Sequence, residues 1–436
     1  MCVLDTTMLN LALPTISQAM NIDPAHALWI VNAGQIIPLM VLFPLSALGD
    51  RLGYKRIYLS GIALFGLASM LSAFAPSLPW LVTARALQGL GVAAVLSVNT
   101  ALVRQIYPPA LLGRGIALNS MVTAISTVSG PLLAAAVLSA APSWRMLFTL
   151  HLPVALGVLL LGWRYLPGSV TSPERSRAKW SWVDVVLNMG LFGGIFLALD
   201  RLSHAGQSLQ WPWLLAWLSI ASVCGVLYVR RQRPLAQPML PLDLMATRVY
   251  QFSMGSSAFA FSAQTVAFLA LPFFMAQSFG LSLGETGMVL TAWPIALALT
   301  APWVGRAIGS TSSALLSSSG MGLLALGMGL VAAMPHDAGF IGMVWRLGLC
   351  GAGFALFQAP NNHTFVSAAP RARSGAASGL MGSSRHAGQC LGALSLSATF
   401  VLAGNDSAGI ALWLACVWAL LSALCSGLRH RSASQA

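Results

Sequence analysis

The sequence predicts an all-α protein that crosses a membrane many times. Of its 436 residues, 57% are hydrophobic and only 8% are charged, whereas soluble domains carry about 25% charged residues. Apolar runs of roughly 20 residues, each long enough to cross the hydrocarbon core of a bilayer as a helix, recur along the whole chain. Most Lys and Arg residues lie in the short segments between these runs. These three observations indicate a polytopic membrane protein without a separate soluble domain.

The apolar runs predict about fourteen transmembrane helices. An even number of spans returns both termini to the same side of the membrane. The first run carries an acid close to its start, so we expect either an earlier start of the chain or a truncated first span. The predicted spans are residues 2–20, 27–47, 57–75, 78–103, 115–140, 145–165, 182–200, 211–229, 250–277, 285–305, 311–334, 339–360, 374–402 and 408–428.

The formal net charge of +13 could indicate a nucleic-acid partner. The distribution of the charge argues against one, because 18 of the 23 Lys and Arg residues fall on one predicted side of the membrane. This bias is the positive-inside pattern, so that side and both termini are expected to be cytoplasmic. The six Cys residues lie in apolar runs and show no CxxC or His-spaced pattern, so no metal site is predicted.

An internal repeat divides the chain. The matched pairs are Arg85 with Arg346, Gly115 with Gly375, and Ser46 with Gly305, at offsets of 261, 260 and 259 residues. We therefore predict two six-helix bundles, at residues 1–166 and 249–436, and a linker at residues 167–248 that holds two additional transmembrane helices. Repeats of this kind are typical of transporters whose site lies between the two halves.

A short basic segment joins the second and third apolar runs. Asp50 stands where one run ends, and Gly53 can adopt the positive φ of a tight turn. Arg51 and Arg56 place positive charge at this edge, and the segment could serve only to set topology. Alternatively, Asp50 could act as a conformational latch that accepts hydrogen bonds from a helix start or pairs with a basic group of the other half. Gly309 stands in its place in the second half, so only one half carries this acid.

Polar residues inside two apolar runs mark a candidate site. Asp5 and Asn10 lie in the first run, and an acid in the middle of a bilayer costs roughly 2.5–3.5 kcal/mol. Arg85 in the fourth run needs acceptors or an acidic partner, and Gln88 lies one turn along the same helix face. We predict that these four residues form a proton-coupling or substrate site. A structural Arg85, bonded only to backbone carbonyls, is the alternative.

These segments resemble the major facilitator superfamily. The basic segment resembles the family's loop G-x-L-a-D-R-x-G-r-R, which implies that Asp50, Arg51, Gly53 and Arg56 form a conformational gate. The start of the first run matches the L-D-x-T-x-x-N-x-A-L-P signature of the fourteen-span drug:proton antiporters, a group that includes multidrug, quaternary-ammonium and methyl-viologen efflux proteins. The resemblance covers essentially the whole chain and implies a major facilitator fold. Family members have further residues before the signature acid.

Three further segments resemble the same family. Gly130 and Pro131 in the fifth run match the antiporter pattern G-P-x-x-G-G, although alanines replace its last two glycines. His151 stands where the family has Asn, and a lone His is more often a hydrogen-bonded core residue than a proton site. Arg385 and His386 resemble the family's s-R-q-l-G-g-a-l-G helix and are candidate site residues in the second half.

The resemblance and the embedded polar residues together predict a proton-coupled secondary exporter of small amphipathic or cationic compounds, which works by alternating access. We expect a monomer in the cell inner membrane that uses the proton gradient and no cofactor. The sequence shows no nucleophile–His–acid set and no phosphate-binding loop, so an enzyme is not predicted.

Two other functions stay open. The basic residues Arg85, Arg346 and Arg385 would suit a transporter of an anionic metabolite, with Arg346 as a further second-half candidate. A membrane sensor or assembly scaffold that transports nothing is an alternative of a different class. Efflux assays with dyes, biocides and organic acids would separate the three.

Overall fold

The computed structural model describes residues 1–22, 24–140, 143–168, 181–203, 211–235, 238–281, 283–335, 337–370, 373–403 and 407–434. The first half of the chain, in the order of its helices, contains α1 (Cys2–Met20), α2 (Pro24–Leu52), α3 (Tyr54–Ala73), α4 (Leu78–Ile106), α5 (Leu112–Ala140), α6 (Arg145–Thr149) and α7 (His151–Tyr165). Two further long helices follow, α8 (Trp182–Ser203) and α10 (Trp211–Gln232). The short helix α11 (Leu242–Met245) leads into the second half, which contains α12 (Arg248–Phe279), α13 (Leu283–Leu290), α14 (Ala292–Ala307), α15 (Ser313–Ala332), α16 (Phe340–Ser367), α17 (Ser374–Ala403) and α18 (Ser407–Ser434).

Every predicted apolar run coincides with one of these helices or with a pair of them. The run at 145–165 is divided at Leu150 into α6 and α7, and the run at 285–305 is divided at Thr291 into α13 and α14. Within the described residues, 11 helices are long and apolar enough to cross a membrane. The all-helical membrane fold is thereby confirmed, and the count of fourteen spans stays a prediction.

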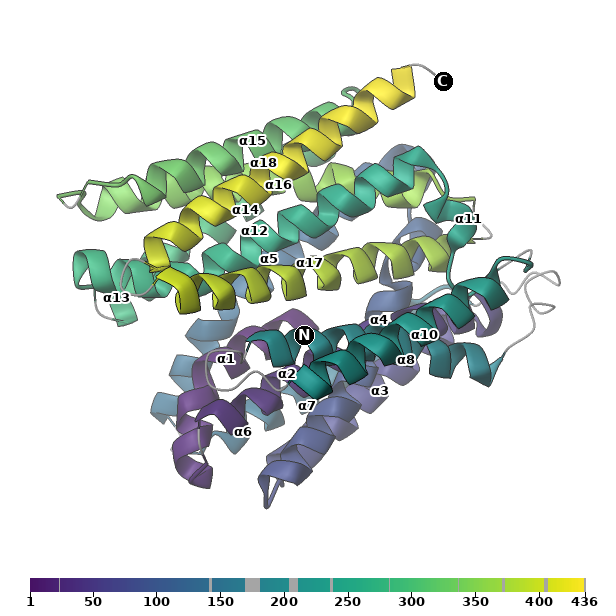
Figure 1. Cartoon of the computed structure of the whole chain (residues 1–436), viewed down its shortest axis with the longest axis horizontal. Coiled ribbons are helices and arrows are strands. Elements are labelled where there is room, and N and C mark those ends of the chain that lie inside the picture. The colour runs from purple at the N-terminus through teal and green to yellow at the C-terminus, as the bar shows by residue number, and fades with distance from the viewer. Residues whose placement is uncertain are drawn as a thin grey trace.

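The same neighbours recur in the two halves. In the first half α3 packs against α4 and α7, α2 against α4, and α1 against α5; in the second half α15 packs against α16 and α18, α14 against α16, and α12 against α17. The halves meet where α2 packs against α17 and α5 against α14. In Figure 1 most second-half helices lie above most first-half helices, and α5 lies among the upper group. The boundaries proposed for the two bundles and the linker stay predictions.

Close glycine contacts show how the repeat aligns. These contacts are Gly89 with Gly34 and Gly91 with Gly61 in the first half, and Gly351 with Trp293 and Gly353 with Gly320 in the second. The matched glycines of α4 and α16 are therefore 262 residues apart (353 − 91). The repeat position of Arg85 is then Leu347, which is fully buried. Pairing Arg85 with Arg346 is wrong by one residue, and one residue rotates a side chain about 100° around the helix axis.

The inserted helices α8 and α10 pack against each other, and α8 packs against α2. A Cβ atom at Gly190 of α8 would lie 2.6 Å from Sγ of Cys224 on α10, so these two residues face one another. The amide of Asn188 donates a hydrogen bond of 2.6 Å to the Met40 carbonyl of α2. The pair α8–α10 therefore lies on the outer side of α2.

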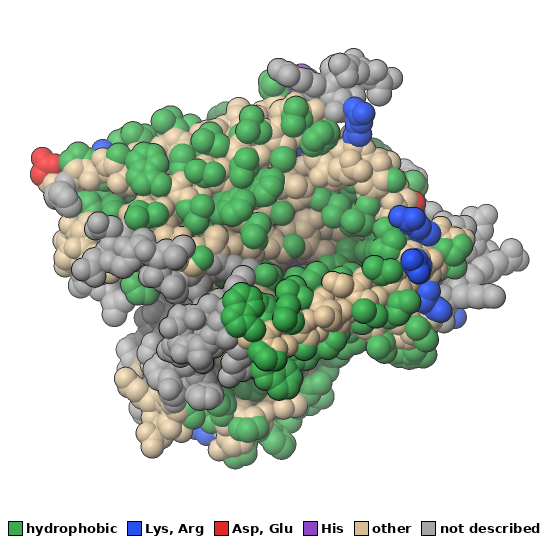
Figure 2. Space-filling model, viewed as in Figure 1, with side chains coloured by type: hydrophobic (Ala, Val, Ile, Leu, Met, Phe, Trp, Pro, Cys, Tyr) green, Lys and Arg blue, Asp and Glu red, His purple; other side chains and the backbone are tan. Residues whose placement is uncertain are grey.

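The outer surface is apolar over a wide area. Figure 2 shows a face covered largely by hydrophobic side chains, with Lys and Arg side chains gathered mainly at one end of the molecule, near α11. Trp213 and Val223 of α10 and Trp413 and Leu424 of α18 are among the large exposed side chains. Apolar area of this extent suits contact with lipid. We call the end with the gathered basic residues, where α2 turns into α3 and where α5 and α17 begin, the basic end.

Candidate functional site

The carboxylate of Asp5 lies inside the first half, and the residue is only 3% exposed. Nη1 of Arg85 on α4 donates to Oδ2 of Asp5 at 2.8 Å, and Nε2 of Gln88 donates to Oδ1 at 3.0 Å. Both carboxylate oxygens are therefore hydrogen-bonded. Three of the four residues predicted for one site, Asp5, Arg85 and Gln88, thus lie together and form a buried ion pair supported by a neutral amide.

Arg85 and Gln88 are held by further contacts. They are three positions apart on α4, which places both side chains on one helix face, and Arg85 donates to the Gln88 side-chain oxygen. Nε of Arg85 donates to the Ile30 carbonyl at 3.2 Å, and Gln88 donates to Oγ of Ser69 on α3 at 3.0 Å. A Cβ atom at position 34 would lie 2.9 Å from Nη2, so Gly34 makes room for the guanidinium. Extra hydrogen bonds of this kind offset part of the cost of burying an ion pair.

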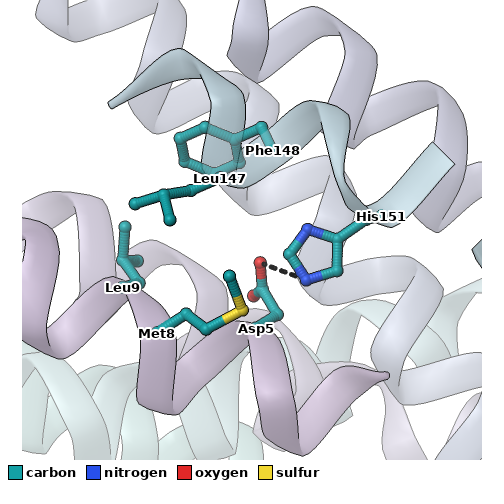
Figure 3. Close-up of a pocket in the computed structure, with 6 residues that line it drawn as sticks. All are labelled: Asp5, Met8, Leu9, Leu147, Phe148 and His151. Carbon is teal, nitrogen blue, oxygen red and sulfur yellow. Dashed lines mark ion pairs between the residues drawn. The ribbon is translucent and has the colours of Figure 1, made fainter. Parts of the chain in front are cut away.

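His151, the first residue of α7, lies beside this ion pair. Its Nε2 is 3.9 Å from Oδ1 of Asp5, and its ring meets that of Phe65 edge to face. Figure 3 shows His151 and Asp5 pointing toward one another at a small cavity, whose remaining lining residues are Met8, Leu9, Leu147 and Phe148. The sequence analysis favoured a core role for His151 over a proton site, and it did not predict the contact with Asp5.

Gly130 brings α5 close to α1. A Cβ atom at this position would overlap the side chain of Thr7, two residues along α1 from Asp5. The two helices therefore pack closely at Gly130. The side chains of Asn10 and Pro131 lie outside the part of the chain that the structure describes.

Asp50 links the two halves at the basic end. Its Oδ1 accepts a hydrogen bond of 3.1 Å from the backbone N–H of Gly375, the second residue of α17. The hydroxyl of Tyr54 donates to the same oxygen at 2.6 Å. A helix N-terminus attracts negative charge because its first N–H groups lack partners within the helix. Two kinds of partner are predicted for Asp50, a helix start and a basic group of the other half. The hydrogen bond from Gly375 is of the first kind.

Further bonds join the halves beside Asp50. Nη1 of Arg104 on α4 donates to the Ala369 carbonyl at 2.8 Å and to Oγ of Ser374 at 3.2 Å. The backbone N–H of Ala101 donates to Oγ of Ser378 at 3.1 Å. These polar contacts all hold α17 and the segment before it against the first half at the basic end.

The turn between α2 and α3 consists of Gly53 alone, with the predicted positive φ of 96°. Arg51 is half-buried in the last turn of α2, and Arg56 is exposed in the first turn of α3. The second half differs at the corresponding place, because α14 ends at Ala307 and Gly309 lies in the turn beyond it, with a φ of 105°.

The second-half candidates lie in separate surroundings. Nη1 of Arg346 donates to the Gly342 carbonyl of its own helix at 2.7 Å, and its guanidinium lies over the ring of Trp345. The guanidinium of Arg385 lies 4.8 Å from the ring centroid of Phe261. Among the described contacts, none joins Arg346, Arg385 or His386 to the Asp5–Arg85 pair.

Arg429 is a buried polar residue that sequence reasoning missed. It follows the last predicted span, residues 408–428, but it lies on α18 and is 2% exposed. Its Nη1 donates to Ser253 and to Asn361, each at 2.8 Å, and its Nη2 donates to Ser317 at 3.2 Å. Arg429 thus ties α12, α15 and α16 to α18. Its position just after a long apolar run was the only feature of the sequence that could have indicated its burial.

The described residues contain no group of three or more His, Cys, Asp or Glu suited to a metal ion.

Comparisons with known proteins show the family. The profile of the Major Facilitator Superfamily matches residues 1–393. The chain is 40% identical over 429 residues to the uncharacterized transporter YebQ of Escherichia coli (strain K12), covering 98% of this chain and 93% of YebQ. It is 29% identical over 393 residues to the multidrug resistance protein Stp of Mycobacterium tuberculosis (strain ATCC 25618 / H37Rv), covering 90% of this chain and 72% of Stp.

The solved structure of the human organic anion transporter MFSD10 (TETRAN) matches with a TM-score of 0.69 at 16% identity, covering 98% of this chain and 96% of that one. This likeness shows the fold. The chain therefore belongs to the Major Facilitator Superfamily and is a multi-pass membrane transporter rather than an enzyme. The likeness to Stp confirms the resemblance to multidrug efflux proteins.

Proposed function

We propose that the protein exports small amphipathic or cationic compounds in exchange for protons, by alternating access of a site between its halves. The observation that carries this proposal is the buried Asp5–Arg85 pair, an ionisable acid placed deep in a membrane protein together with its counterion. Such groups mark ion and proton paths in membrane proteins. The relationship to Stp supports the choice of substrate class.

Protonation of Asp5 would remove the negative charge that pairs with Arg85 in the first half. A neutral acid no longer pairs with the guanidinium, and Arg85 keeps only the Gln88 side chain and the Ile30 carbonyl as acceptors. A buried charge that loses its partner is costly, so the protonated site favours a different arrangement of α1 and α4. Each proton that enters gains about 2.3 kcal/mol per 100 mV of membrane potential.

The geometry also refines how a substrate could use Asp5. Both carboxylate oxygens already accept hydrogen bonds from Arg85 and Gln88. A cationic substrate could therefore form an ion pair with the Asp5 carboxylate only after Arg85 has moved away from it. Proton and substrate would then act on the same ion pair rather than simply compete for a free acid.

We further propose that the protein works as a monomer in the cell inner membrane, with both termini in the cytoplasm. The proton gradient supplies its energy, and neither a cofactor nor a nucleic acid takes part. The basic end would then face the cytoplasm, in keeping with the positive-inside rule.

The test is ethidium efflux from proteoliposomes or everted vesicles with an imposed pH gradient. Asp5→Asn should abolish gradient-driven efflux while the protein still inserts and folds, because Asn keeps the size of the side chain and cannot take up a proton. Glu285→Gln, at an exposed acid of α13, is the matched control and should behave as wild type. Full gradient-driven efflux in Asp5→Asn would remove Asp5 from the coupling mechanism.

An anionic metabolite is the second candidate substrate. It is favoured by Arg385, which lies beside the ring of Phe261 and has a buried Nε without a hydrogen-bond partner among the described residues. The same vesicles with organic acids in place of ethidium would identify this activity. A chain that moved neither class of compound would agree with the sensor or scaffold alternative.

A further inference from the structure

The imidazole of His151 is buried without the hydrogen bonds that such a ring normally makes. The residue is 2% exposed. Neither ring nitrogen has a hydrogen-bond partner of ordinary geometry among the described residues. Buried polar groups are almost always hydrogen-bonded, and the exceptions call for an explanation. A histidine that served only to fill the core would normally satisfy at least one nitrogen.

The groups that face His151 come from several helices. From α1 it meets Asp5, with Nε2 3.9 Å from Oδ1, and the amino group of Met1 lies within electrostatic range. Arg85 faces it from α4, and α3 contributes the ring of Phe65. The backbone carbonyl of Leu147, one turn before it, approaches the ring in a geometry poorer than that of an ordinary hydrogen bond. Asp5 is therefore the acid that His151 faces, at a distance that one small shift of either side chain would close to a hydrogen bond.

His151 and Asp5 also line the same small cavity (Figure 3). The other lining side chains, Met8, Leu9, Leu147 and Phe148, are apolar. The two titratable groups therefore border one small, mainly apolar cavity. Histidine is the side chain whose ordinary pKa, about 6.5, allows its charge to change near neutral pH.

We propose that His151 is a second proton-carrying residue of the coupling site and passes its proton to Asp5. In this step the Nε2–H bond of the imidazolium breaks and an O–H bond forms on Oδ1 of Asp5. The ring returns to its neutral form, and the carboxylate becomes a neutral acid. Gln88 and Arg85 then lose an anionic acceptor together. This inference rests on the proposed proton coupling at Asp5 and adds the residue through which the proton arrives.

The substitution His151→Asn provides the sharpest test, because the antiporters that the chain resembles carry Asn at this position. Asn preserves a polar side chain and cannot carry a proton at neutral pH. The control is His430→Asn, since His430 is an exposed histidine on α18 that contacts Oγ of Ser312 at 3.2 Å, far from Asp5 in the sequence and on the other half. If His151→Asn folds poorly, His151→Gln replaces it.

The first measurement is the rate of ethidium efflux against pH. His151→Asn should lose one titration step of the wild-type profile and fall about 100-fold in maximal rate, the lower range for a positioned proton-transfer group. His430→Asn should keep the wild-type profile. A His151→Asn profile of wild-type shape, even at a uniformly lower rate, would make His151 a structural residue and overturn the proposal.

The second measurement needs no transported compound. The infrared band of the protonated Asp5 carboxyl, assigned by its loss in Asp5→Asn, is followed against pH in the purified protein. Coupled groups titrate in two steps that belong to the pair, so the band should change in two steps in wild type and in one step in His151→Asn. An identical titration in both proteins would overturn the role of His151. If wild type moved no ethidium, the proposed function would fail for this dye, and the infrared titration would still decide the role of His151.

Discussion

Oδ1 of Asp50 and the backbone N–H of Gly375 are joined by a hydrogen bond of 3.1 Å that crosses from the first half of the molecule to the second. A Cβ atom at position 375 would lie 2.6 Å from the same oxygen, so the approach depends on glycine. Bonds from Arg104 to the segment before α17 reinforce the contact. This end of the interface can open only when these bonds break.

Asp50→Ala should therefore weaken the closed state of the basic end. Hydrogen bonds to a charged group contribute about 1.5–3 kcal/mol, and a loss in this range shifts a two-state equilibrium roughly 10- to 150-fold. We expect slower turnover and a bias toward opening at the basic end. The measurements are the efflux rate and the accessibility of single cysteines from each side of the membrane.

Asp50→Asn serves as the matched control, because its side-chain oxygen can still accept the N–H of Gly375. It should lie between wild type and Asp50→Ala in accessibility. Unchanged accessibility combined with an altered pH optimum would mean that Asp50 titrates during transport and is not a latch.

Arg85→Ala should halt coupled transport and lower stability. Removal of one partner from a buried ion pair costs about 3–5 kcal/mol, because the remaining charge is left unpaired. Arg85→Lys should rescue poorly, since Lys lacks the planar fork that reaches both Asp5 and Gln88. Thermal unfolding in detergent measures the loss, and the double variant Asp5→Asn with Arg85→Gln should recover most of it. A stable, fully active Arg85→Ala protein would contradict the assignment.

Two glycines of α15 offer a test of helix packing. A Cβ atom at Gly320 would lie 2.6 Å from the Gly353 carbonyl, whereas a Cβ atom at Gly322 would meet nothing within 4 Å. Gly320→Ala should destabilise the protein by about 1–3 kcal/mol through overpacking. Gly322→Ala should be neutral or slightly stabilising, because alanine favours helix. Equal melting temperatures for the two variants would show that α15 and α16 are not packed in this register.

The inserted helices should lie outside the transport path. Cys224 faces Gly190 between α8 and α10, so a water-soluble maleimide should label it slowly, and substrate should not change that rate. Gly190→Ala should disturb the packing of α8 on α10 and leave substrate selectivity unaltered. Protection of Cys224 by ethidium would place it in the path and contradict this expectation.

Much of the fold could be predicted from the sequence, because each membrane span needs a long apolar run and few charges interrupt these runs. Asp5 and Arg85 could be predicted as members of one site, because polar groups inside apolar runs need partners, whereas their direct ion pair is a finding of the structure. The predicted register of the repeat is wrong by one residue. Pairing Arg85 with Arg346 places Gly89 opposite Cys350, whereas the pattern of glycines pairs Gly89 with Gly351 and Gly91 with Gly353, as the contacts of these glycines show.

Other parts of the site depend on tertiary packing. His151 reaches Asp5 because α7 packs against α3 while α3 packs against α4, and no local pattern encodes that arrangement. Arg429 was misplaced because the apolar run before it ends at Leu428, whereas α18 continues to Ser434. Hydrogen-bonding serines and Asn361 on three neighbouring helices make the burial of its charge tolerable.

The position of α8 and α10 has a consequence for how compounds could enter from the lipid. Near the basic end, Phe43 of α2 and Leu380 of α17 share one apolar cluster with Leu191 of α8 and Tyr228 of α10. The seam between α2 and α17 is thus covered there from the hydrocarbon side, whereas neither inserted helix is among the main packing partners of α5 or α14 in the described residues. The two seams between the halves, α2–α17 and α5–α14, would be alike in a two-fold symmetric molecule, but only the first is covered by inserted helices. An apolar compound that entered from the lipid at the basic end would therefore enter beside α5 and α14.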